Sequence, residues 1–339
     1  MHFCTQLYKL WKEKYEKAVF SLAFDIIFPA TVLIAGIVLL TISSDKAVEH
    51  SVHLASALGI SSLMIGLVLV SIGTDLPEIA NSIVSCYSGH GDIDMGDSIG
   101  SILTQITLIV GLVAFLSRGF TVKRHEVLVI GAFEILALVL AMAVALTGFT
   151  RIKALLLIAS WPIFIWLIKR FTKREIIKKK LFTHEPRRHY FIHFMIAALG
   201  FVGVAVGAIA VVQAVIMLSS NLRVPEFLIS FFVLAIGTSL PELVVDLTAV
   251  RKRQYELAIG DIIGSCIVDA TVSISIGQLL FPTAVFVEAP RRSVLLASYA
   301  ILASAGVILT LALREKLDKK AAILFFVLYA ISYVLLYTI

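Results

Sequence analysis

Two short motifs place acidic, hydroxyl and helix-breaking residues together inside strongly apolar stretches. Residues 73–78 read GTDLPE, and residues 237–242 read GTSLPE. Proline removes an amide donor and clashes with the carbonyl four residues earlier, so we expect each helix to break and leave carbonyl oxygens of residues 71–74 and 235–238 for a ligand. Four-residue spacing puts a hydroxyl and a carboxylate on one helix face, and it is shared by two pairs: Thr74 with Glu78, and Thr238 with Glu242.

A second motif follows each of these, GDSIGS at 96–101 and GDIIGS at 260–265. It continues at the same four-residue spacing, with Ser101 and Gln105 in one copy and Ser265 and Asp269 in the other. Oxygen donors of this kind suit Ca²⁺, Na⁺ or Mg²⁺ and do not suit soft metals. If the two faces converge, they form a cation cage. The motif glycines are expected to allow close helix contact.

The acids of these motifs would be costly inside a membrane unless something compensates their charge. An ionised carboxylate at the centre of a spanning helix costs about 2.5–3.5 kcal/mol, so seven would approach 20 kcal/mol, more than a typical folding free energy. The seven are Asp75, Glu78, Asp97, Glu242, Asp246, Asp261 and Asp269. They must therefore be paired with cations, protonated or hydrated. Asp97 and Asp261 could equally be helix caps or groups that support the ligands, and Glu134 is interpreted as a structural acid.

The two pairs of motifs are copies of each other. Residues 71–105 align with residues 235–269 at an offset of 164 without a gap, and eleven of the 35 positions are identical, including Pro, Glu, Asp and Ser. Unrelated apolar segments share only a handful of positions, and not in blocks with these residues. We infer an internal duplication, whose period is much longer than that of a short-repeat array.

The composition shows what kind of element carries these motifs. Hydrophobic residues make up 59% of the 339 residues and charged residues 15%, and mean hydropathy is +0.98. These values exclude a soluble enzyme, a disulfide scaffold and a disordered protein. Ten apolar stretches are long enough to span a bilayer. They lie near 20–43, 62–86, 95–117, 125–147, 152–171, 190–218, 226–250, 256–280, 293–313 and 321–338.

We therefore predict an all-α polytopic membrane protein with ten transmembrane helices arranged as two inverted five-helix repeats. Each repeat has an odd number of spans, so the second copy enters the membrane with the opposite orientation. The predicted segments are an N-terminal interfacial helix at 1–19, the first repeat at 20–171, a basic loop at 172–189 and the second repeat at 190–339.

Charge distribution predicts the orientation. Because basic residues mark cytoplasmic loops, the central loop is assigned to the cytoplasm, and alternating loops then place 20 of the 29 basic residues on that side. The net charge of +6 is explained in this way rather than by nucleic-acid binding. The three cysteines lack metal-ligand spacing and are interpreted as packing residues. We expect an integral protein of the plasma or inner membrane, with the bilayer as a partner and protein partners unspecified.

In these two blocks the sequence resembles the calcium/cation antiporter superfamily, and most closely its sodium/calcium exchanger branch. GTSLPE at 237–242 and the GDIIGS motif continued to Asp269 carry the resemblance, which extends over essentially the whole chain. It implies alternating access, in which Na⁺ entering down its gradient drives Ca²⁺ out through a shared site. The metal-binding residues it implies are glutamates Glu78 and Glu242, hydroxyls of Thr74, Ser101, Thr238, Ser239 and Ser265, carbonyls of Ser71 and Ala235, and Gln105 and Asp269.

The chain departs from the family pattern at three places. Asp75 stands where the family usually has Ser, Gln105 replaces Asn, and Asp97 and Asp261 replace the Asn after Gly. Asp75 adds a possible metal ligand and a negative charge, which leaves three alternatives open. The favoured function is Ca²⁺/Na⁺ exchange, the second is H⁺-coupled transport of Ca²⁺ or another divalent cation, and a cation channel is favoured least. None of them is an enzyme, and the only ions required are those transported.

Overall fold

Helices make up nearly all of the computed structural model, which describes residues 23–55, 65–117, 120–172, 187–251, 253, 255–287 and 290–337. Helices satisfy their backbone hydrogen bonds internally, as a lipid environment requires. The two strands, β1 (Phe120–Thr121) and β2 (Lys316–Leu317), form one short antiparallel pair. The predicted interfacial helix at 1–19 and most of the predicted loop at 172–189 lie outside the described residues.

The helical segments of each half follow one another in the same order. Labels with η denote π-helical turns. The first half contains η1 (Ala23–Ile27), α2 (Phe28–Ala55), η2 (Ile65–Val70), α4 (Ser71–Thr74), α5 (Leu76–Tyr87), α6 (Gly91–Leu103), η3 (Thr104–Ile109), α7 (Val110–Leu116), α8 (Arg124–Leu146) and α9 (Arg151–Thr172). The second contains α10 (Arg187–Leu222), α11 (Glu226–Ile229), η4 (Ser230–Leu234), α12 (Ala235–Thr238), α13 (Leu240–Arg251), α14 (Tyr255–Val268), η5 (Asp269–Ser273), α15 (Ile274–Leu280), α16 (Pro290–Arg314) and α17 (Lys319–Tyr337).

The sequence repeat is also a repeat of structure. Gln105 and Asp269 are 164 residues apart in the sequence. When 164 is added to the residue numbers of the first half, the first and last residues of α4, α5 and α7 become those of α12, α13 and α15. The π-helical turns η2 and η3 fall on η4 and η5 to within a residue. The duplication therefore extends to the irregular turns. The opposite orientation of the two halves in a membrane stays a prediction.

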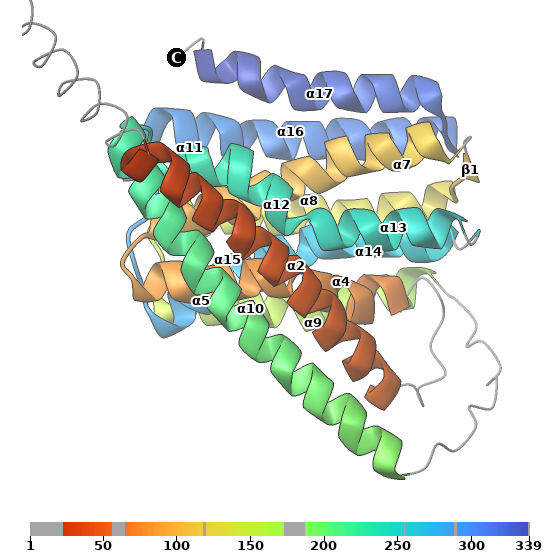
Figure 1. Ribbon diagram of the computed structural model, residues 1–339. Coiled ribbons are helices and arrows are strands. Elements are labelled where there is room, and N and C mark those ends of the chain that lie inside the picture. Colours follow the sequence, from red (N-terminus) through yellow and green to blue (C-terminus); the bar gives the residue numbers. More distant parts are fainter. Residues whose placement is uncertain are drawn as a thin grey trace, which may run out of the picture.

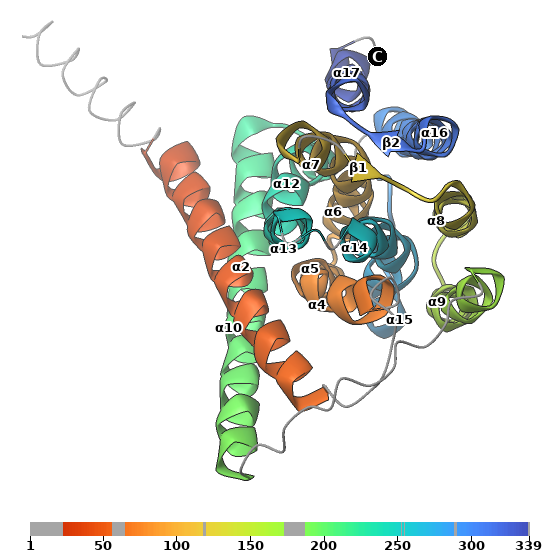
Figure 2. The same cartoon turned by 90° about the vertical axis from the view of Figure 1, so that its right-hand side faces the viewer.

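The helices form two groups in space. Helices α2 and α10 lie side by side and cross the others obliquely (Figure 1). The other long helices run roughly parallel to one another and are seen nearly end-on in Figure 2, with α6 and α14 among the innermost. Burial agrees with this arrangement, because 89% of the apolar stretch within Tyr255–Leu280 is buried inside the protein, against 22% of the one within Arg151–Thr172. The duplicated motifs thus occupy the core.

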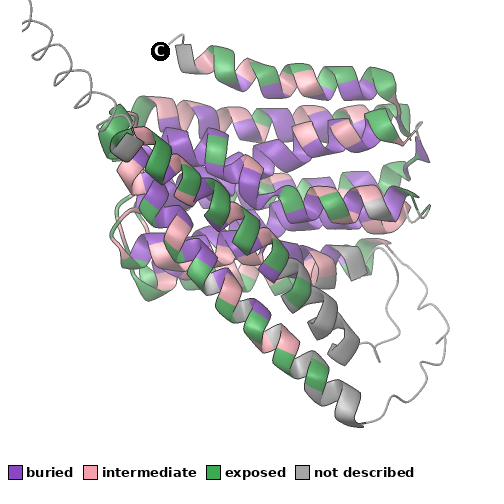
Figure 3. Ribbon diagram, viewed as in Figure 1, coloured by how far each residue is buried: buried purple, intermediate pink, exposed green. Residues whose placement is uncertain are grey.

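The outer surface is apolar, as expected for contact with lipid. Among the described residues, eight helical stretches are long and apolar enough to cross a membrane. Large exposed side chains such as Ile152, Leu302 and Leu199 lie on outer helices, and exposed residues follow the outward faces in Figure 3. The other two predicted spans, near 62–86 and 321–338, coincide with helices that begin at Ile65 and Lys319. The count of ten crossings stays a prediction.

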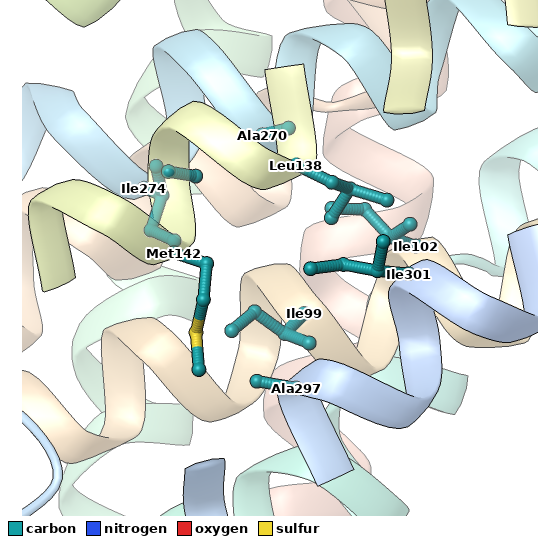
Figure 4. A pocket seen from close by; sticks show the side chains of 9 residues that line it. Ile99, Ile102, Leu138, Met142, Ala270, Ile274, Ala297 and Ile301 are labelled. Atoms are coloured by element: carbon teal, nitrogen blue, oxygen red, sulfur yellow. The ribbon is translucent and has the colours of Figure 1, made fainter. Parts of the chain in front are cut away.

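One small cavity lies between α6, α8, α15 and α16, and its lining is wholly apolar (Figure 4). Its volume is about 10 Å³, close to the smallest space that holds a water molecule, and water also needs polar partners. Side chains such as Ile99, Met142 and Ile301 provide none. The cavity is a packing gap rather than a ligand site.

Candidate cation site

Both copies of the first motif interrupt a helix at the residue before Leu-Pro-Glu. Asp75 lies between α4 and α5 with ψ near 6°, and Ser239 lies between α12 and α13 with ψ near 10°. Pro77 and Pro241 therefore fall in the first turn of a new helix, where the missing amide donor removes no hydrogen bond. The predicted break is present in both copies, and it holds Asp75 and Ser239 at the centre of the molecule.

The prolines were expected to free the carbonyl oxygens of Ser71 and Ala235 from helical hydrogen bonds, and this expectation is wrong. The Ser71 carbonyl accepts a hydrogen bond of 2.9 Å from the Asp75 amide, and the Ala235 carbonyl accepts one of 3.2 Å from the Ser239 amide. Proline acts at its own position and does not free these two groups. Each carbonyl keeps a second lone pair that can accept another donor or a cation. The carbonyl oxygen of Ala235 lies 3.5 Å from the buried hydroxyl of Ser101.

Three acids converge beside these breaks. Asp75, Glu78 and Glu242 each place a carboxylate oxygen within 4.8 Å of the others, and all three are at most 1% exposed. No Lys or Arg is among the buried side chains of the described residues. Two ionised carboxylates at this separation repel by about 3.5 kcal/mol at an effective dielectric constant of about 20. The group therefore requires bound cations or protons.

Hydroxyl groups surround the acids in matched pairs. The Thr74 and Ser265 hydroxyl oxygens are 3.4 Å apart, and those of Thr238 and Ser101 are 3.3 Å apart. Under the 164-residue offset these are the same contact made twice, with the partners exchanged between copies. Ser101 also donates a hydrogen bond of 3.3 Å to Glu78. Reciprocal contacts of this kind are those that a two-fold relation between the copies would produce.

Gln105 and Asp269 occupy the same position in the two copies and contact each other directly. The Gln105 amide donates a hydrogen bond of 3.3 Å to the Asp269 carboxylate. In a pair of copies related by a two-fold axis, a residue that touches its own repeat mate lies on or near that axis. The relation itself stays a prediction. Asp269 also lies near Asp75. The candidate ligands therefore include two acids from each copy, Asp75 and Glu78 from the first and Glu242 and Asp269 from the second, all buried.

Comparison with known proteins identifies the family. The sequence model of the family described as "Sodium/calcium exchanger protein" matches residues 28–169 and residues 192–338. The chain belongs to the sodium/calcium exchanger family. It is therefore a multi-pass membrane protein of an antiporter family, which confirms the predicted resemblance. The match in two segments places one in each half of the chain.

Named relatives and solved structures agree with this assignment. The uncharacterized membrane protein MJ0091 of Methanocaldococcus jannaschii is 30% identical over 300 residues, covering 88% of this chain and 94% of its own. The sodium/calcium exchanger MaX1 of Methanosarcina acetivorans is 26% identical over 296 residues, covering 75% and 83%. The solved structure of the sodium-calcium exchanger NCX_Mj, soaked with Na⁺ and Sr²⁺, is similar with a TM-score of 0.63 at 26% identity, covering 91% of this chain and 98% of that one.

Within this exchanger fold, the motif glycines allow the two copies to approach closely, as predicted. A Cβ atom added at Gly100 would lie 2.5 Å from the Phe231 carbonyl oxygen, and one at Gly96 would lie 2.5 Å from that of Phe227. Gly264 meets Leu67, the repeat mate of Phe231. Helix α6 of one copy thus packs on the interrupted helix of the other, and α14 does the same in return.

The structure decides between the roles considered for Asp97 and Asp261, because neither residue lies at the start of a helix. Asp97 lies well inside α6 and accepts hydrogen bonds of 3.0 Å from Thr238 and from Asn81, so it is not a helix cap. Asp261 likewise lies inside α14, beside Asp246 and Glu242. Sequence reasoning missed Asn81. The available signal was a polar residue in α5 where the second copy has Val245.

Glu134 is not one of the three grouped acids. It is fully buried in α8, with Ser304 of α16 and Cys266 of α14 near its carboxylate. Its interpretation as a structural acid stays a prediction. Glu134 is useful in another way, because it is a buried carboxylate in α8 that belongs neither to the grouped acids nor to the expected ligands, and it can serve as a control for substitutions among them.

Proposed function

We propose that this chain is a secondary antiporter that exchanges Ca²⁺ for Na⁺ by alternating access at one central site. The observation that carries the proposal is the group formed by Asp75, Glu78 and Glu242, whose carboxylate oxygens lie within 4.8 Å of one another in a buried position surrounded by hydroxyl and carbonyl oxygens. An empty cage of this charge repels itself, whereas either a Ca²⁺ ion or several Na⁺ ions would satisfy it. This difference favours movement of the loaded protein and opposes movement of the empty one.

The proposed ligands are those expected from the motifs. Glu78 and Glu242 bind Ca²⁺ directly. The other ligands complete the Na⁺ sites. They are the hydroxyls of Thr74, Ser101, Thr238, Ser239 and Ser265, the carbonyls of Ser71 and Ala235, and the side chains of Asp75, Gln105 and Asp269. Ca²⁺ and Na⁺ accept carboxylate, hydroxyl and carbonyl oxygens alike, so both ions can use one cage. The relatives described as sodium/calcium exchangers support this assignment.

The proposed topology has ten spans in two inverted repeats. Two-fold contacts between the copies support it, because a relation by an axis in the membrane plane inverts the second copy. Contacts between loops also agree with the predicted sides. The predicted inner loops are joined by β1 with β2 and by Lys123 with Glu256 at 2.9 Å. The predicted outer loops are joined by His90 with Glu226 at 2.7 Å.

The location follows from this topology. We propose that the protein resides in the plasma or inner membrane with the central basic loop in the cytoplasm, since most basic residues then lie inside. In that orientation the end of the molecule that carries β1 and β2 faces the cytoplasm. The end that carries the α5–α6 turn faces outward.

The test of the function is exchange by the purified full chain in liposomes. Uptake of ⁴⁵Ca²⁺ driven by an outward Na⁺ gradient is expected for the wild type and for Glu134→Gln, and it is expected to be lost in Glu78→Gln and in Glu242→Gln. Glutamine keeps the size and removes the charge. Undiminished Ca²⁺ flux in the Glu78→Gln, Glu242→Gln double variant would refute the proposed site.

One observation favours H⁺ as an alternative counter-ion. Asp75 brings the central carboxyl groups to four, and both of its oxygens lack a hydrogen-bond partner among the described residues. Acids at such separations can share protons. Ca²⁺ uptake driven by a pH gradient in the complete absence of Na⁺ would support H⁺ coupling. A channel would instead conduct without a counter-ion and show single-channel currents.

A further inference from the structure

The first copy carries polar side chains along α5 and α6 where the second copy is apolar. At the same repeat positions, Asn81 replaces Val245, Cys86 replaces Val250, and Asp94 replaces Ala258. All three polar side chains are at most 2% exposed. Burial of a polar group without a partner is costly, so this one-sided accumulation calls for a reason that the central site, built from both copies, does not supply.

These residues continue the hydrogen-bond network of the central site toward the α5–α6 turn. Ser101 links Glu78 to the Thr238 hydroxyl, and Thr238 donates a hydrogen bond of 3.0 Å to one oxygen of Asp97. The other oxygen of Asp97 accepts a hydrogen bond of 3.0 Å from the Asn81 amide. Polar contact is therefore continuous from the central acids to the α5–α6 interface.

Asp94 lies one turn before Asp97 on the same face of α6. The Cys86 thiol donates to one oxygen of the Asp94 carboxylate at 3.4 Å. Cys86 in turn accepts a contact of 3.6 Å from the Thr283 hydroxyl. Thr283 is half-buried in the segment after α15, at the end of the molecule that holds the His90–Glu226 pair. The network thus reaches the protein surface.

Two oxygens along this route have no partner among the described residues. They are Oδ1 of Asp94 and Oδ1 of Asn81, and these side chains are 1% and 0% exposed. The Asp94 carboxylate also has the Ser82 and Gln278 side chains beside it, so the Asn81 oxygen is the one that most clearly requires a ligand. A proton could satisfy a carboxylate, but an amide oxygen is not basic and accepts only a donor or a cation. A hard cation takes carboxylate and amide oxygens together.

We propose that Asp94, Asn81 and Asp97 form a second cation site, which takes Ca²⁺ on the access route between the α5–α6 end and the central site. The direction of transport in this inference rests on the proposed function. The second copy has no equivalent, because Val245 and Ala258 replace two of the three ligands. The two access routes therefore differ chemically, and Ca²⁺ arriving from the α5–α6 end meets an additional binding step.

The matched substitutions are those that the second copy itself carries, Asn81→Val and Asp94→Ala. Both residues are accommodated at the equivalent buried positions of α13 and α14. Asp97 is left intact because it contacts Thr238. Glu134→Gln serves as the control for removal of a buried carboxylate elsewhere in the membrane.

The first measurement is equilibrium ⁴⁵Ca²⁺ binding to the purified full chain. In the Glu78→Gln, Glu242→Gln variant, which lacks two of the four central acids, we expect residual weaker binding. Adding Asn81→Val and Asp94→Ala should abolish this residual binding, whereas adding Glu134→Gln should leave it. The second cation site is overturned if no residual binding is found, or if residual binding survives both substitutions, and wild-type exchange can remain intact in either case.

The second measurement compares transport from the two sides. In right-side-out and inverted membrane vesicles, Asn81→Val with Asp94→Ala should raise the KM for Ca²⁺ about three- to tenfold when Ca²⁺ is offered at the α5–α6 end. The KM from the other end and kcat should change less than twofold. Equal changes from both ends, or none from either, would refute an access-route site. Loss of Na⁺-driven exchange by the wild type would instead refute the proposed function.

Discussion

Substitution of Gly100 by alanine tests whether the contact between the two copies is as close as the structure shows. The added Cβ atom would lie 2.5 Å from the Phe231 carbonyl oxygen and 2.8 Å from the Ala235 Cβ atom. An ordinary contact begins near 3.4 Å, so α6 would have to move away by about 0.9 Å against backbone that has no flexible end to yield.

The magnitude follows from two opposing effects. Overpacking of a well-packed interior costs about 1–3 kcal/mol. Replacement of a helical glycine by alanine contributes about 0.5–1 kcal/mol of stability where there is space. At Gly100 the steric cost dominates, and the net loss is about 1–2 kcal/mol. At Gly306 of α16, nothing lies within 4 Å of the added atom, so only the favourable effect remains.

The assay is thermal unfolding of the purified variants in detergent, followed by Ca²⁺ exchange in liposomes. We expect Gly100→Ala to lower the apparent Tm and to reduce exchange, because Ser101 and the Ala235 carbonyl move with the displaced helices. Gly306→Ala should have a Tm equal to or above that of the wild type with normal exchange. A Gly100→Ala variant as stable and active as Gly306→Ala would show that the copies are separated more widely than the structure places them.

Three further substitutions have defined outcomes. Asp75→Ser gives the first copy the serine that the second copy has at Ser239, and it should raise the KM for Ca²⁺ in liposome exchange at least about tenfold, because it removes one of three carboxylates within 4.8 Å of one another. An unchanged KM would mean that Asp75 is neutral when Ca²⁺ is bound. Gln105→Asp would place two carboxyls where an amide now donates to Asp269, so its Tm deficit should grow as pH rises and both ionise, and a deficit independent of pH would contradict the contact. At the start of α17, the Ala321 amide donates to Asp318 and, with the Arg314 guanidinium, holds the pKa of that carboxyl below its usual value. The stabilisation by ionised Asp318 is present above about pH 4 and is lost as pH falls through the lowered pKa, so the difference in Tm between Asp318→Ala and wild type should close in acid.

The sequence was sufficient for those features that depend on local chemistry or on comparison of the two copies. Proline after Asp75 and after Ser239 predicted the helix breaks, because its effect acts within one turn. The 164-residue offset predicted which segments repeat. Glycine spacing predicted close contact at Gly96 and Gly100, since small residues at helix spacing have few other uses in membranes.

Features that depend on contacts between distant segments were not accessible in this way. Asp97 looked like a possible helix cap because its distance from the helix start was unknown, and only the structure places the Thr238 hydroxyl 3.0 Å away. Asn81 gave no motif, and its partner is on another helix. The Ser71 carbonyl was expected to be free, but its hydrogen bond depends on how far α4 continues before the break.

The positions where the two copies differ explain how the site keeps its charge. If both copies carried the second copy's residues, the centre would hold Glu and Asp twice, with two carboxylates meeting at the axis where Gln105 and Asp269 now touch. Two carboxylates that face each other at this contact cannot both stay ionised without a cation between them. In this chain the axial contact is an amide donating to a carboxylate, and the fourth acid is Asp75, in place of the serine of the other copy. At these two pairs of repeat positions the number of carboxyls is therefore preserved, while one carboxyl is moved away from the contact between repeat mates.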